Sequence, residues 1–318
     1  MKLGKTAMTE RKTVKVEIVF PCHNRRELTL QCLQSLSRID TDGLEVHTII
    51  VDDGSTDGTS EAVEKTFPAV QIIKADGNLW FTEGTNVGVR AALVREPDYV
   101  LVMNDDQIFD SGFLKYMVET AEKYPQTIVG SLLLLWDLPH KLFQVSPIWE
   151  TLSGGWRHWT RQTIWTIPEK AWEVEMIVGN CLLVPARAVR ECGLMNSARY
   201  PNFGDAEYTP RLRKKGWRLL IEPRARVFCQ PNTVPQSIRR LGWRKMPSAL
   251  IFDLKHAHNL RRRFFASIDS APNRLLGILA FAIFGARSLL RKNSESFWKD
   301  KQPEKPLAEI FASRTVEK

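Results

Sequence analysis

Two adjacent carboxylates follow an apolar run in the stretch VLVMNDDQIFD, residues 100–110. The run predicts a buried strand over 98–106, so Asp105 and Asp106 stand where that strand ends. Like charges this close disfavour ionisation unless a cation lies beside them. A divalent ion such as Mg²⁺ is often bound through one or two carboxylates plus substrate phosphates, but Asp is also common in solvated turns. The pair alone leaves both interpretations open.

Polar residues also stand at the ends of three earlier predicted strands. Strand 14–20 leads to Pro21, Cys22, His23 and Asn24, strand 46–55 carries Asp52 and Asp53, and strand 70–76 leads to Gly77 and Asn78. Helices predicted over 26–39, 59–67 and 82–94 separate these strands, and this alternation predicts an α/β fold with a doubly wound, mostly parallel sheet and helices on both faces. Because ligands of such sheets bind outside the carboxyl ends of the strands, we expect the four ends to share one site.

Several classes of protein are disfavoured by what the sequence lacks. It has no GxGxxG or GxxxxGK[ST] loop, which argues against a Rossmann dinucleotide site and a P-loop. Its five cysteines include no CxxC pair, which argues against a zinc site or a disulfide framework and favours a reducing cytoplasm. The first apolar run is too short for a signal peptide or a membrane span, so the residues before it predict a loose polar leader.

Positive charge is concentrated in the C-terminal half of the chain. Residues 211–292 hold 19 Lys and Arg against 3 Asp and Glu, a charge of +16 that leaves −7 for the rest of a chain whose net charge is +9. Past residue 247 the pattern is helical, and an apolar run between Arg274 and Arg287 is shorter than the roughly 20 residues of a spanning helix. With Arg291 and Lys292 beside it, this run predicts a helix lying in the interface of an anionic membrane. A core helix or an oligomer contact is the alternative.

Six segments in order resemble the inverting glycosyltransferases of family 2, which have the GT-A fold. They are VFPCHNRRE, IIVDDGSTDGT, ADGNLWFTEGTNVGVRAAL, VLVMNDDQIF, VGNCLLVPARAVRECG and FGDAEYTPRLRKKGWRL. The resemblance extends from about Val14 to about Gly242. Within it, DGNLWFTEGTN looks most like the rhamnosyltransferases of bacterial surface polysaccharides, which implies dTDP-rhamnose as the donor and leaves UDP-sugars open.

The resemblance implies roles on the donor side. Asp53 would contact the base, and Pro21 and Asn24 would line the nucleotide pocket. Asp106, with Asp105, would hold Mg²⁺ or Mn²⁺ on the diphosphate. The donor sugar would be bordered by Asn78, Trp80, Gly84 and Asn86, although Gly84 and Asn86 could instead only pack a helix.

On the acceptor side, the resemblance implies that Asp205 is the general base and that Glu207 orients the acceptor. Asn180 belongs to the acceptor-side strand. Six of the ten tryptophans fall within 131–176, and of these Trp156 and Trp159 are expected to contact the acceptor. The alternatives are that Glu207 pairs with the basic helix behind it and that the tryptophans are core anchors.

Three departures from the family pattern weaken the metal site and the acidic motif. Asn104 replaces the first acid of the family's DxD, and Gly204 stands where a second acid often precedes the base. Cys229 and Gln230 occupy the region where members often carry a histidine that reaches the metal or the diphosphate. Metal dependence is therefore the least secure implication of the resemblance.

The predicted organisation is a leader over 1–13, a GT-A domain over 14–245, a helical and possibly membrane-associating extension over 246–292 and a polar tail over 293–318. Residues 14–110 would bind the nucleotide and 111–245 the acceptor. The implied function is transfer of a sugar to a saccharide or lipid-linked saccharide in surface polysaccharide synthesis, such as that of lipopolysaccharide O-antigen, on the cytoplasmic face of the cell membrane. Oligomeric state stays open.

Two other functions stay open as alternatives. A nucleotidyltransferase would also use paired acids and Mg²⁺, but it normally begins with a glycine-rich basic loop, which PCHNRRE is not. A nucleic-acid-binding protein could use the basic half, but the sequence has no zinc-finger or RNA-recognition signature, and its strand-end acids would repel phosphates. We therefore expect no nucleic-acid partner.

Overall fold

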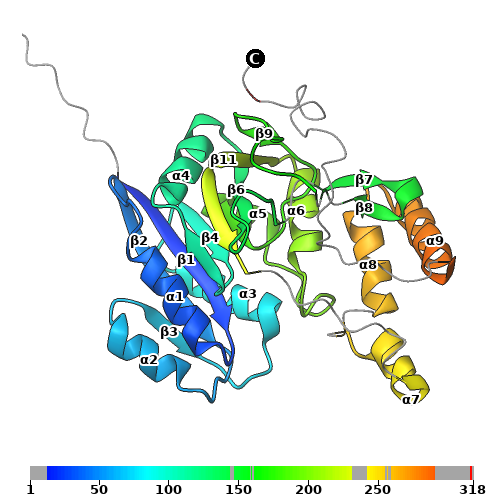
Figure 1. Cartoon of the computed structure of the whole chain (residues 1–318), viewed down its shortest axis with the longest axis horizontal. Helices are drawn as coiled ribbons and strands as arrows, with labels where there is room; N and C mark the ends of the chain where they lie inside the picture. Colours follow the sequence, from blue (N-terminus) through cyan, green and yellow to red (C-terminus); the bar gives the residue numbers. More distant parts are fainter. Residues whose placement is uncertain are drawn as a thin grey trace, which may run out of the picture.

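The N-terminal half of the chain alternates strands and helices, as its sequence predicts (Figure 1). The computed structural model describes residues 13–143, 147–157, 159, 161–230, 242–254, 256, 259–290 and 316. The elements are β1 (Val14–Cys22), α1 (Arg26–Leu36), β2 (Leu44–Asp52), α2 (Thr59–Thr66), β3 (Gln71–Lys74), α3 (Trp80–Leu93) and β4 (Tyr99–Met103). Their strands are parallel in the order β3-β2-β1-β4. The carboxyl ends of β1, β2 and β4 therefore meet at one edge.

The second half of the sheet is mixed. β10 (Cys181–Pro185) is antiparallel to β4 and to β6 (Thr127–Leu135), whereas β11 (Arg218–Cys229) is parallel to β6. The short strands β5 (Gln107–Phe109) and β9 (Trp172–Glu173) are antiparallel to β11. The whole order is β3-β2-β1-β4-β10-β6-β11-β5, with β9 beside β11. The predicted doubly wound α/β sheet is confirmed, with antiparallel strands confined to its second half.

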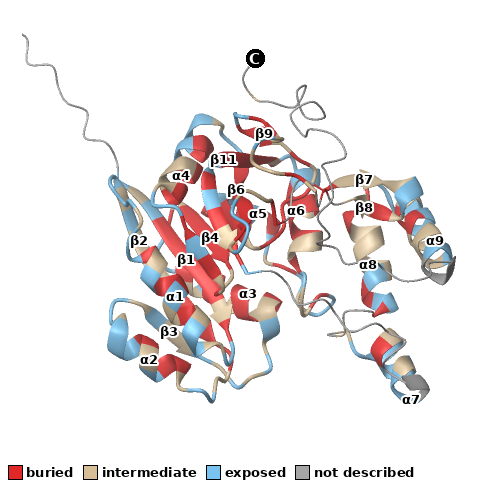
Figure 2. Cartoon of the chain, viewed as in Figure 1, coloured by how far each residue is buried: buried red, intermediate tan, exposed pale blue. Residues whose placement is uncertain are grey.

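Helices cover both faces of this sheet, and each face has its own apolar core. One core joins α1 and α4 (Phe113–Lys123) to the strands through residues such as Ile18 and Leu101. The other joins α3, α5 (Ala186–Cys192) and α6 (Asp205–Lys214) through Val19 and Val102. Alternate residues of β1 and β4 thus enter opposite cores, which explains why these strands are apolar almost throughout. Figure 2 shows the buried central strands between the two helix layers.

The strand predicted over 98–106 ends earlier, at Met103. The next three residues form a turn, and the chain resumes at Gln107 as β5, beside β11 instead of β4. The backbone N–H of Asn104 donates to the backbone carbonyl oxygen of Asn180 at 3.1 Å, at the point where β4 ends and the turn begins. Asp105 and Asp106 therefore belong to the turn between β4 and β5 and not to a strand.

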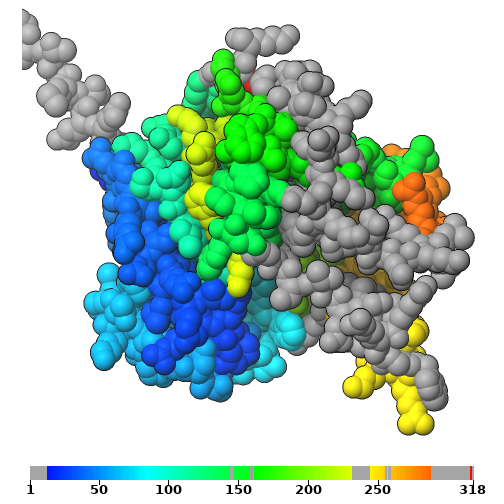
Figure 3. Space-filling model, in the orientation of Figure 1, coloured from blue at the N-terminus to red at the C-terminus, as the bar shows by residue number. Residues whose placement is uncertain are grey.

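The helical region predicted after residue 247 is confirmed. It contains a π-helical turn over Ser248–Phe252, α8 (Leu260–Ser270) and α9 (Arg274–Leu290), and α7 (Gly242–Pro247) directly precedes it. α8 packs on α6 and α9, and α9 lies beside the hairpin of β7 (Ile148–Glu150) and β8 (Gly155–Arg157) (Figure 1). In the space-filling view, α7 projects at the edge of the molecule (Figure 3). None of the helices in the described ranges has the length and apolarity that crossing a membrane requires. The predicted leader and most of the predicted tail lie outside the described residues.

Gly88 allows α3 to approach the sheet, and we predict that Gly88→Ala destabilises the protein. A Cβ there would lie 2.3 Å from Val19 Cγ1 and 3.2 Å from Val51 Cγ2, both on fully buried strand residues. Overpacking of this kind costs about 1–3 kcal/mol in the free energy of unfolding, which urea titration would measure. The control is Gly285→Ala in α9, where a Cβ would meet nothing within 4 Å. Equal stability of the two variants would contradict the prediction.

Candidate active site

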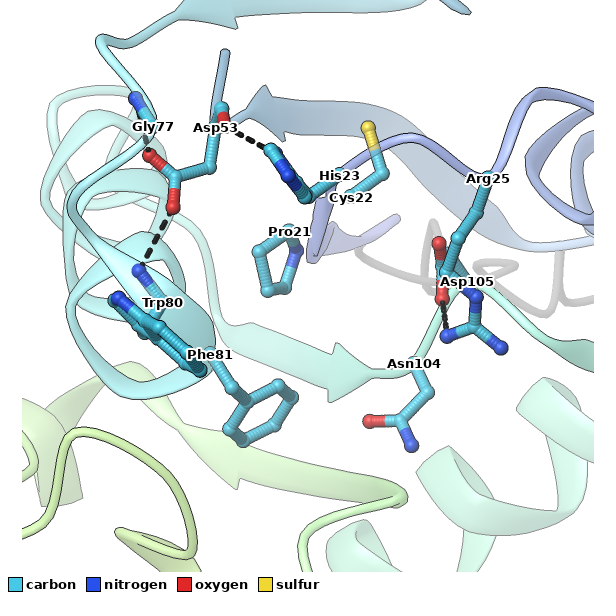
Figure 4. A pocket seen from close by; sticks show the side chains of 10 residues that line it. All are labelled: Pro21, Cys22, His23, Arg25, Asp53, Gly77, Trp80, Phe81, Asn104 and Asp105. Atoms are coloured by element: carbon cyan, nitrogen blue, oxygen red, sulfur yellow. Dashed lines mark hydrogen bonds and ion pairs between the residues drawn. The ribbon is translucent and has the colours of Figure 1, made fainter. Parts of the chain in front are cut away.

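A cavity of about 300 Å³ opens at the carboxyl ends of β1, β2 and β4, where the sequence predicts a site. Its lining residues are Pro21, Cys22, His23, Arg25, Asp53, Gly77, Trp80, Phe81, Asn104 and Asp105. Figure 4 shows Asp53 and Trp80 at one end, Arg25 and Asp105 at the other, and Pro21 between them. The cavity therefore has an acidic group at each end, and the two acids are stabilised differently.

Backbone amides surround the carboxylate of Asp53. It accepts hydrogen bonds from the N–H groups of Gly77 at 3.1 Å, Leu79 at 3.1 Å and Trp80 at 2.8 Å, and the residue is 5% exposed. Gly77 and Trp80 both have left-handed backbones, with φ of 90° and 60°. Asp53 thus holds the β3–α3 loop in the tight path that forms one wall of the cavity. Because a carboxylate offers about four lone-pair positions, room remains for a further donor.

A guanidinium group lies across the acid pair at the opposite end. Arg25 Nη1 donates to Asp105 Oδ1 at 2.7 Å, and Nη2 donates to Asp106 Oδ2 at 2.8 Å. Thr29 Oγ1 donates to the other oxygen of Asp105 at 3.4 Å. Burial raises the pKa of Asp105 to about 7, an effect that Arg25 opposes and Asp106 reinforces. The repulsion between the two acids is therefore relieved by a cation from the chain itself.

The acid pair fits a divalent ion only in company with a phosphate. Among the described residues, no three His, Cys, Asp or Glu side chains come together as a metal site. Two carboxylates are nevertheless the protein contribution that Mg²⁺ commonly has when substrate phosphates supply further oxygens. Asp106 is the more accessible of the two, since its side chain is 16% exposed against 5% for Asp105. The donor set therefore suits a metal ion shared with a diphosphate.

Asp205 lies at the start of α6, close to the same edge of the sheet. Its Oδ2 accepts from the backbone N–H of Gly179 at 2.8 Å, and a Cβ on Gly179 would stand only 2.6 Å from Asp205 Cβ. Burial raises the pKa of Asp205. The next residue, Asn180, accepts from the amide of Asn104, which lines the cavity. A short chain of contacts thus joins the two acidic motifs that lie about 100 residues apart in sequence.

The beginning of α3 holds the loop that precedes Asp205. The amide of Thr82 donates to the carbonyl oxygen of Pro201 at 3.0 Å, and the amide of Gly204 donates to Thr82 Oγ1 at 3.2 Å. Phe203, in this loop, has φ of 64° and is 55% exposed. The guanidinium carbon of Arg262 in α8 lies 4.8 Å from the centre of its ring. An aromatic face is therefore presented beside Asp205 and supported by the C-terminal helices.

Four other predicted donor-side residues act mainly on the walls of the cavity. Asn24 Oδ1 accepts from the amide of Thr56 at 2.8 Å, which ties the loops after β1 and β2 together. Asn78 is exposed in the β3–α3 loop. At Gly84 a Cβ would lie 2.8 Å from that of Pro21, so the glycine permits close packing of α3 on β1. Asn86 is 3% exposed, and its amide is bonded to both backbone groups of Met195.

The predicted acceptor residues have partners of their own. Glu207 is buried and forms an ion pair with Arg211, one turn later in α6. The indole of Trp156 donates to Ser270 Oγ at 2.9 Å and packs edge-on against Trp149. Trp159 is 8% exposed and contributes to a core, so it has little surface to offer a sugar.

Sequence reasoning missed Arg25, Thr82, Phe203 and Arg262. Arg25 lies inside the segment VFPCHNRRE, and Phe203 is the first residue of the segment that contains Gly204 and Asp205. Both could therefore have been chosen from the sequence as candidate site residues. Thr82 and Arg262 act through contacts with residues far away in sequence, which no local pattern indicates.

Comparison with known proteins identifies related sequences. Residues 17–136 match the model of the family described as Glycosyl transferase family 2. The chain is also 26% identical over 205 residues to N-acetylglucosaminyl-diphospho-decaprenol L-rhamnosyltransferase of two Mycobacterium tuberculosis strains, CDC 1551 / Oshkosh and H37Rv. The aligned part is 58% of this chain and 66% of each relative, so the chain spans a little less than two thirds of the relatives' length.

Solved glycosyltransferase structures share the fold. GalNAc-T7 with UDP, GalNAc and Mn²⁺ superposes with a TM-score of 0.57 at 11% identity, over 83% of this chain and 52% of that one. The mannosyltransferase PcManGT from Pyrobaculum calidifontis, with GDP-Man and Mn²⁺, gives 0.50 at 17% identity over 90% and 77%. TarS of S. aureus gives 0.51 at 16% identity over 82% and 44%. These likenesses confirm the predicted GT-A fold.

Asp53 organises one end of the cavity, and we predict that Asp53→Asn loosens the β3–α3 loop. The amide nitrogen of asparagine cannot accept from the backbone N–H groups that the carboxylate serves, so at least one buried donor loses its partner at a cost of about 1–3 kcal/mol. Hydrogen exchange at Gly77, Leu79 and Trp80 would report the change. Asp76→Asn is the matched control, because within the described part of the chain that exposed acid accepts only one bond, from the backbone N–H of Asn78 at 3.3 Å. Unchanged exchange in Asp53→Asn would refute the prediction.

Proposed function

Because residues 17–136 match the Glycosyl transferase family 2 model, we propose that the chain is an inverting enzyme that transfers a sugar from a nucleoside diphosphate donor to a hydroxyl group. The observation that supports this most directly is one cavity with Asp53 at one end and the Arg25–Asp105–Asp106 cluster at the other. Asp205 is joined to the Asn104 wall of this cavity through Asn180 and Gly179. Transfer from a nucleotide sugar needs three environments: oxygens that accept hydrogen bonds from the nucleobase, charged groups for the diphosphate, and a general base for the hydroxyl group that receives the sugar.

The donor and acceptor are proposed from the relatives. The mycobacterial proteins are named as rhamnosyltransferases acting on a lipid-linked N-acetylglucosaminyl diphosphate. We take dTDP-rhamnose as the first donor to test, with UDP-sugars next, and a saccharide or lipid-linked saccharide of bacterial surface polysaccharide synthesis as the acceptor. A nucleotidyltransferase or a nucleic-acid-binding protein would not be expected to match this family.

On the donor side, Pro21, Asn24 and Asp53 would surround the nucleotide, and Asn78, Trp80, Gly84 and Asn86 would shape the space for the sugar. Asp105 and Asp106 are proposed to hold Mg²⁺ or Mn²⁺, which when bound would supply positive charge to the departing diphosphate. Two of the structural neighbours were solved with Mn²⁺.

On the acceptor side, Asp205 is proposed as the general base. The acceptor oxygen would bond to the anomeric carbon as the bond from that carbon to the diphosphate oxygen breaks, and Asp205 would take the hydroxyl proton. The backbone N–H of Gly179 holds the carboxylate through Oδ2, and the backbone amides at the start of α6 also act on it. Glu207 would act through the position of α6, while Asn180 and Trp156 would border the acceptor. Phe203 adds an exposed ring on which a sugar could stack.

The helix α9 carries an apolar stripe that suits attachment to a membrane surface. Leu275, Ile278 and Leu279 are 79%, 47% and 47% exposed, at the spacing of one helix face. Arg274 and Arg287 flank the stripe and are exposed. Apolar side chains with basic neighbours bind the interface of anionic membranes. We therefore place the enzyme peripherally on the cytoplasmic face of the cell membrane, where a lipid-linked acceptor would be met.

A screen of nucleotide-sugar donors tests both the proposed function and the role of Asp205 as general base. Wild-type protein with Mn²⁺ is expected to hydrolyse or transfer from one nucleotide sugar in preference to others, and Asp205→Asn should lower turnover about 10²–10⁴-fold while keeping donor affinity. Since only the ionised carboxylate can accept a proton and burial raises the pKa of Asp205, the acidic limb of the rate profile should lie above the ordinary aspartate range.

The control for this substitution is Asp110→Asn, an exposed acid at the end of β5. Full turnover in Asp205→Asn would remove Asp205 as the base. Tight RNA binding by the wild type, with no nucleotide preference and no transfer, would refute the enzyme proposal itself.

Membrane attachment through α9 is tested with the double variant Leu275→Glu, Leu279→Glu. Two glutamates would have to be buried in the membrane interface if α9 inserted, so co-sedimentation with phosphatidylglycerol vesicles should fall by about tenfold or more. Val94→Glu is the control, because Val94 is also highly exposed, at 82%, but stands at the end of α3, on another helix. Equal sedimentation of the double variant and the wild type would show that α9 does not mediate attachment.

A further inference from the structure

Arg25 occupies the carboxylates that a metal ion would need. Each of its terminal nitrogens serves a different acid, at 2.7 Å from Asp105 and 2.8 Å from Asp106, so the guanidinium bridges the pair. Guanidinium stays charged throughout the physiological range and is well suited to planar, forked contact with carboxylates. The acid pair therefore has a resident cation before any ligand binds.

The surroundings of Arg25 allow its side chain to move without disturbing the backbone. Its side chain is 37% exposed and lines the cavity, whereas those of Asp105 and Asp106 are 5% and 16% exposed. Its neighbour Arg26 begins α1 and is fixed by a bond from its amide to Asp57 Oδ2 at 3.0 Å. The acids are thus largely buried, while the side chain of Arg25, which is more exposed, lies in the cavity beside Asp105 (Figure 4).

We propose that Arg25 competes with a divalent cation for Asp105 and Asp106, so that the pair binds metal tightly only when a diphosphate is present. This rests on the proposed function for the identity of the diphosphate. In the free protein the guanidinium holds one oxygen of each acid and repels a second cation. A diphosphate in the cavity offers Arg25 an alternative anion, and the oxygens that Arg25 leaves become available. Metal and donor then bind together.

A purely structural ion pair would behave differently. If Arg25 served only to hold α1 to the β4–β5 turn, its removal would disorder the two acids and would leave metal affinity unchanged or weaker. Competition predicts the opposite sign, because removal of a neighbouring positive charge favours a dication at the same carboxylates. The sign of the change in metal affinity therefore separates the two roles.

The experiment is a titration of the full chain with Mn²⁺, with free Mn²⁺ followed by electron paramagnetic resonance and no nucleotide present. Arg25→Gln should bind Mn²⁺ about tenfold more tightly than the wild type, since loss of a unit charge a few ångströms away changes the interaction by at least this much at intermediate dielectric. Addition of dTDP or UDP should tighten Mn²⁺ binding in the wild type and have less effect in Arg25→Gln. Arg25→Lys, which keeps the charge but lacks the planar fork of guanidinium, should lie between the two.

Two controls fix the site of the effect. Arg26→Gln removes the same charge from the adjacent exposed position and should leave Mn²⁺ affinity as in the wild type. Asp106→Asn added to Arg25→Gln should abolish the gain. Circular dichroism confirms folding, and if Arg25→Gln does not fold, the comparison of Arg25→Lys with the wild type decides.

Equal or weaker Mn²⁺ affinity in the folded Arg25 variants would overturn the competition. The titration uses no sugar donor, so it is independent of transfer activity. Tighter Mn²⁺ binding in Arg25→Gln together with no transfer from any nucleotide sugar would support the competition and refute the proposed function.

Discussion

Two carboxylates can stand side by side at the end of β4 because the guanidinium of Arg25 lies across them. Without that charge, a buried Asp105 beside Asp106 would be strongly unfavourable as an ionised pair. The same contact joins the beginning of α1 to the β4–β5 turn, which are 80 residues apart in sequence. Thr29 strengthens the connection from the next turn of α1. One ion pair thus both permits the acidic site and fixes one end of the cavity.

The other end of the cavity solves the same problem with neutral groups. Asp53 is as buried as Asp105, but it is stabilised by three backbone amides that carry no net charge. Its end of the cavity therefore offers carboxylate oxygens to ligand N–H donors, whereas the Arg25 end combines both signs and can respond to an anion. The two ends of the cavity therefore favour different ligand groups. A nucleoside diphosphate would fit with its nucleobase toward Asp53 and its diphosphate toward Arg25.

The sequence predicted those parts of the fold that depend on neighbouring residues. The alternation of β1 to β4 with α1 to α3 and the polar strand ends were visible in local patterns, and the strand-end rule then placed Pro21, Asp53 and Asp105 in one cavity. The short strands β5 and β9 were not predicted, because their partner β11 lies far along the chain and three residues carry little periodicity. The contact of Arg25 with Asp105 and Asp106 was not predicted either, because it joins residues about 80 positions apart. By contrast, the pair Glu207 and Arg211 has helical spacing and was anticipated as an alternative.

The C-terminal helices are connected to the loop before Asp205 and to α6 by several independent contacts. Asp269 in α8 accepts from Arg199 at 2.7 Å and from Tyr200 at 2.8 Å, both in the loop that leads to Phe203. Lys214, at the end of α6, donates to the carbonyl oxygen of the same Asp269 at 2.7 Å. α8 in turn packs on α9, whose apolar stripe faces outward. If α9 rests on a membrane as proposed, the fold sets the distance of Asp205 from the membrane surface, and a membrane-anchored acceptor would meet the proposed general base at that distance.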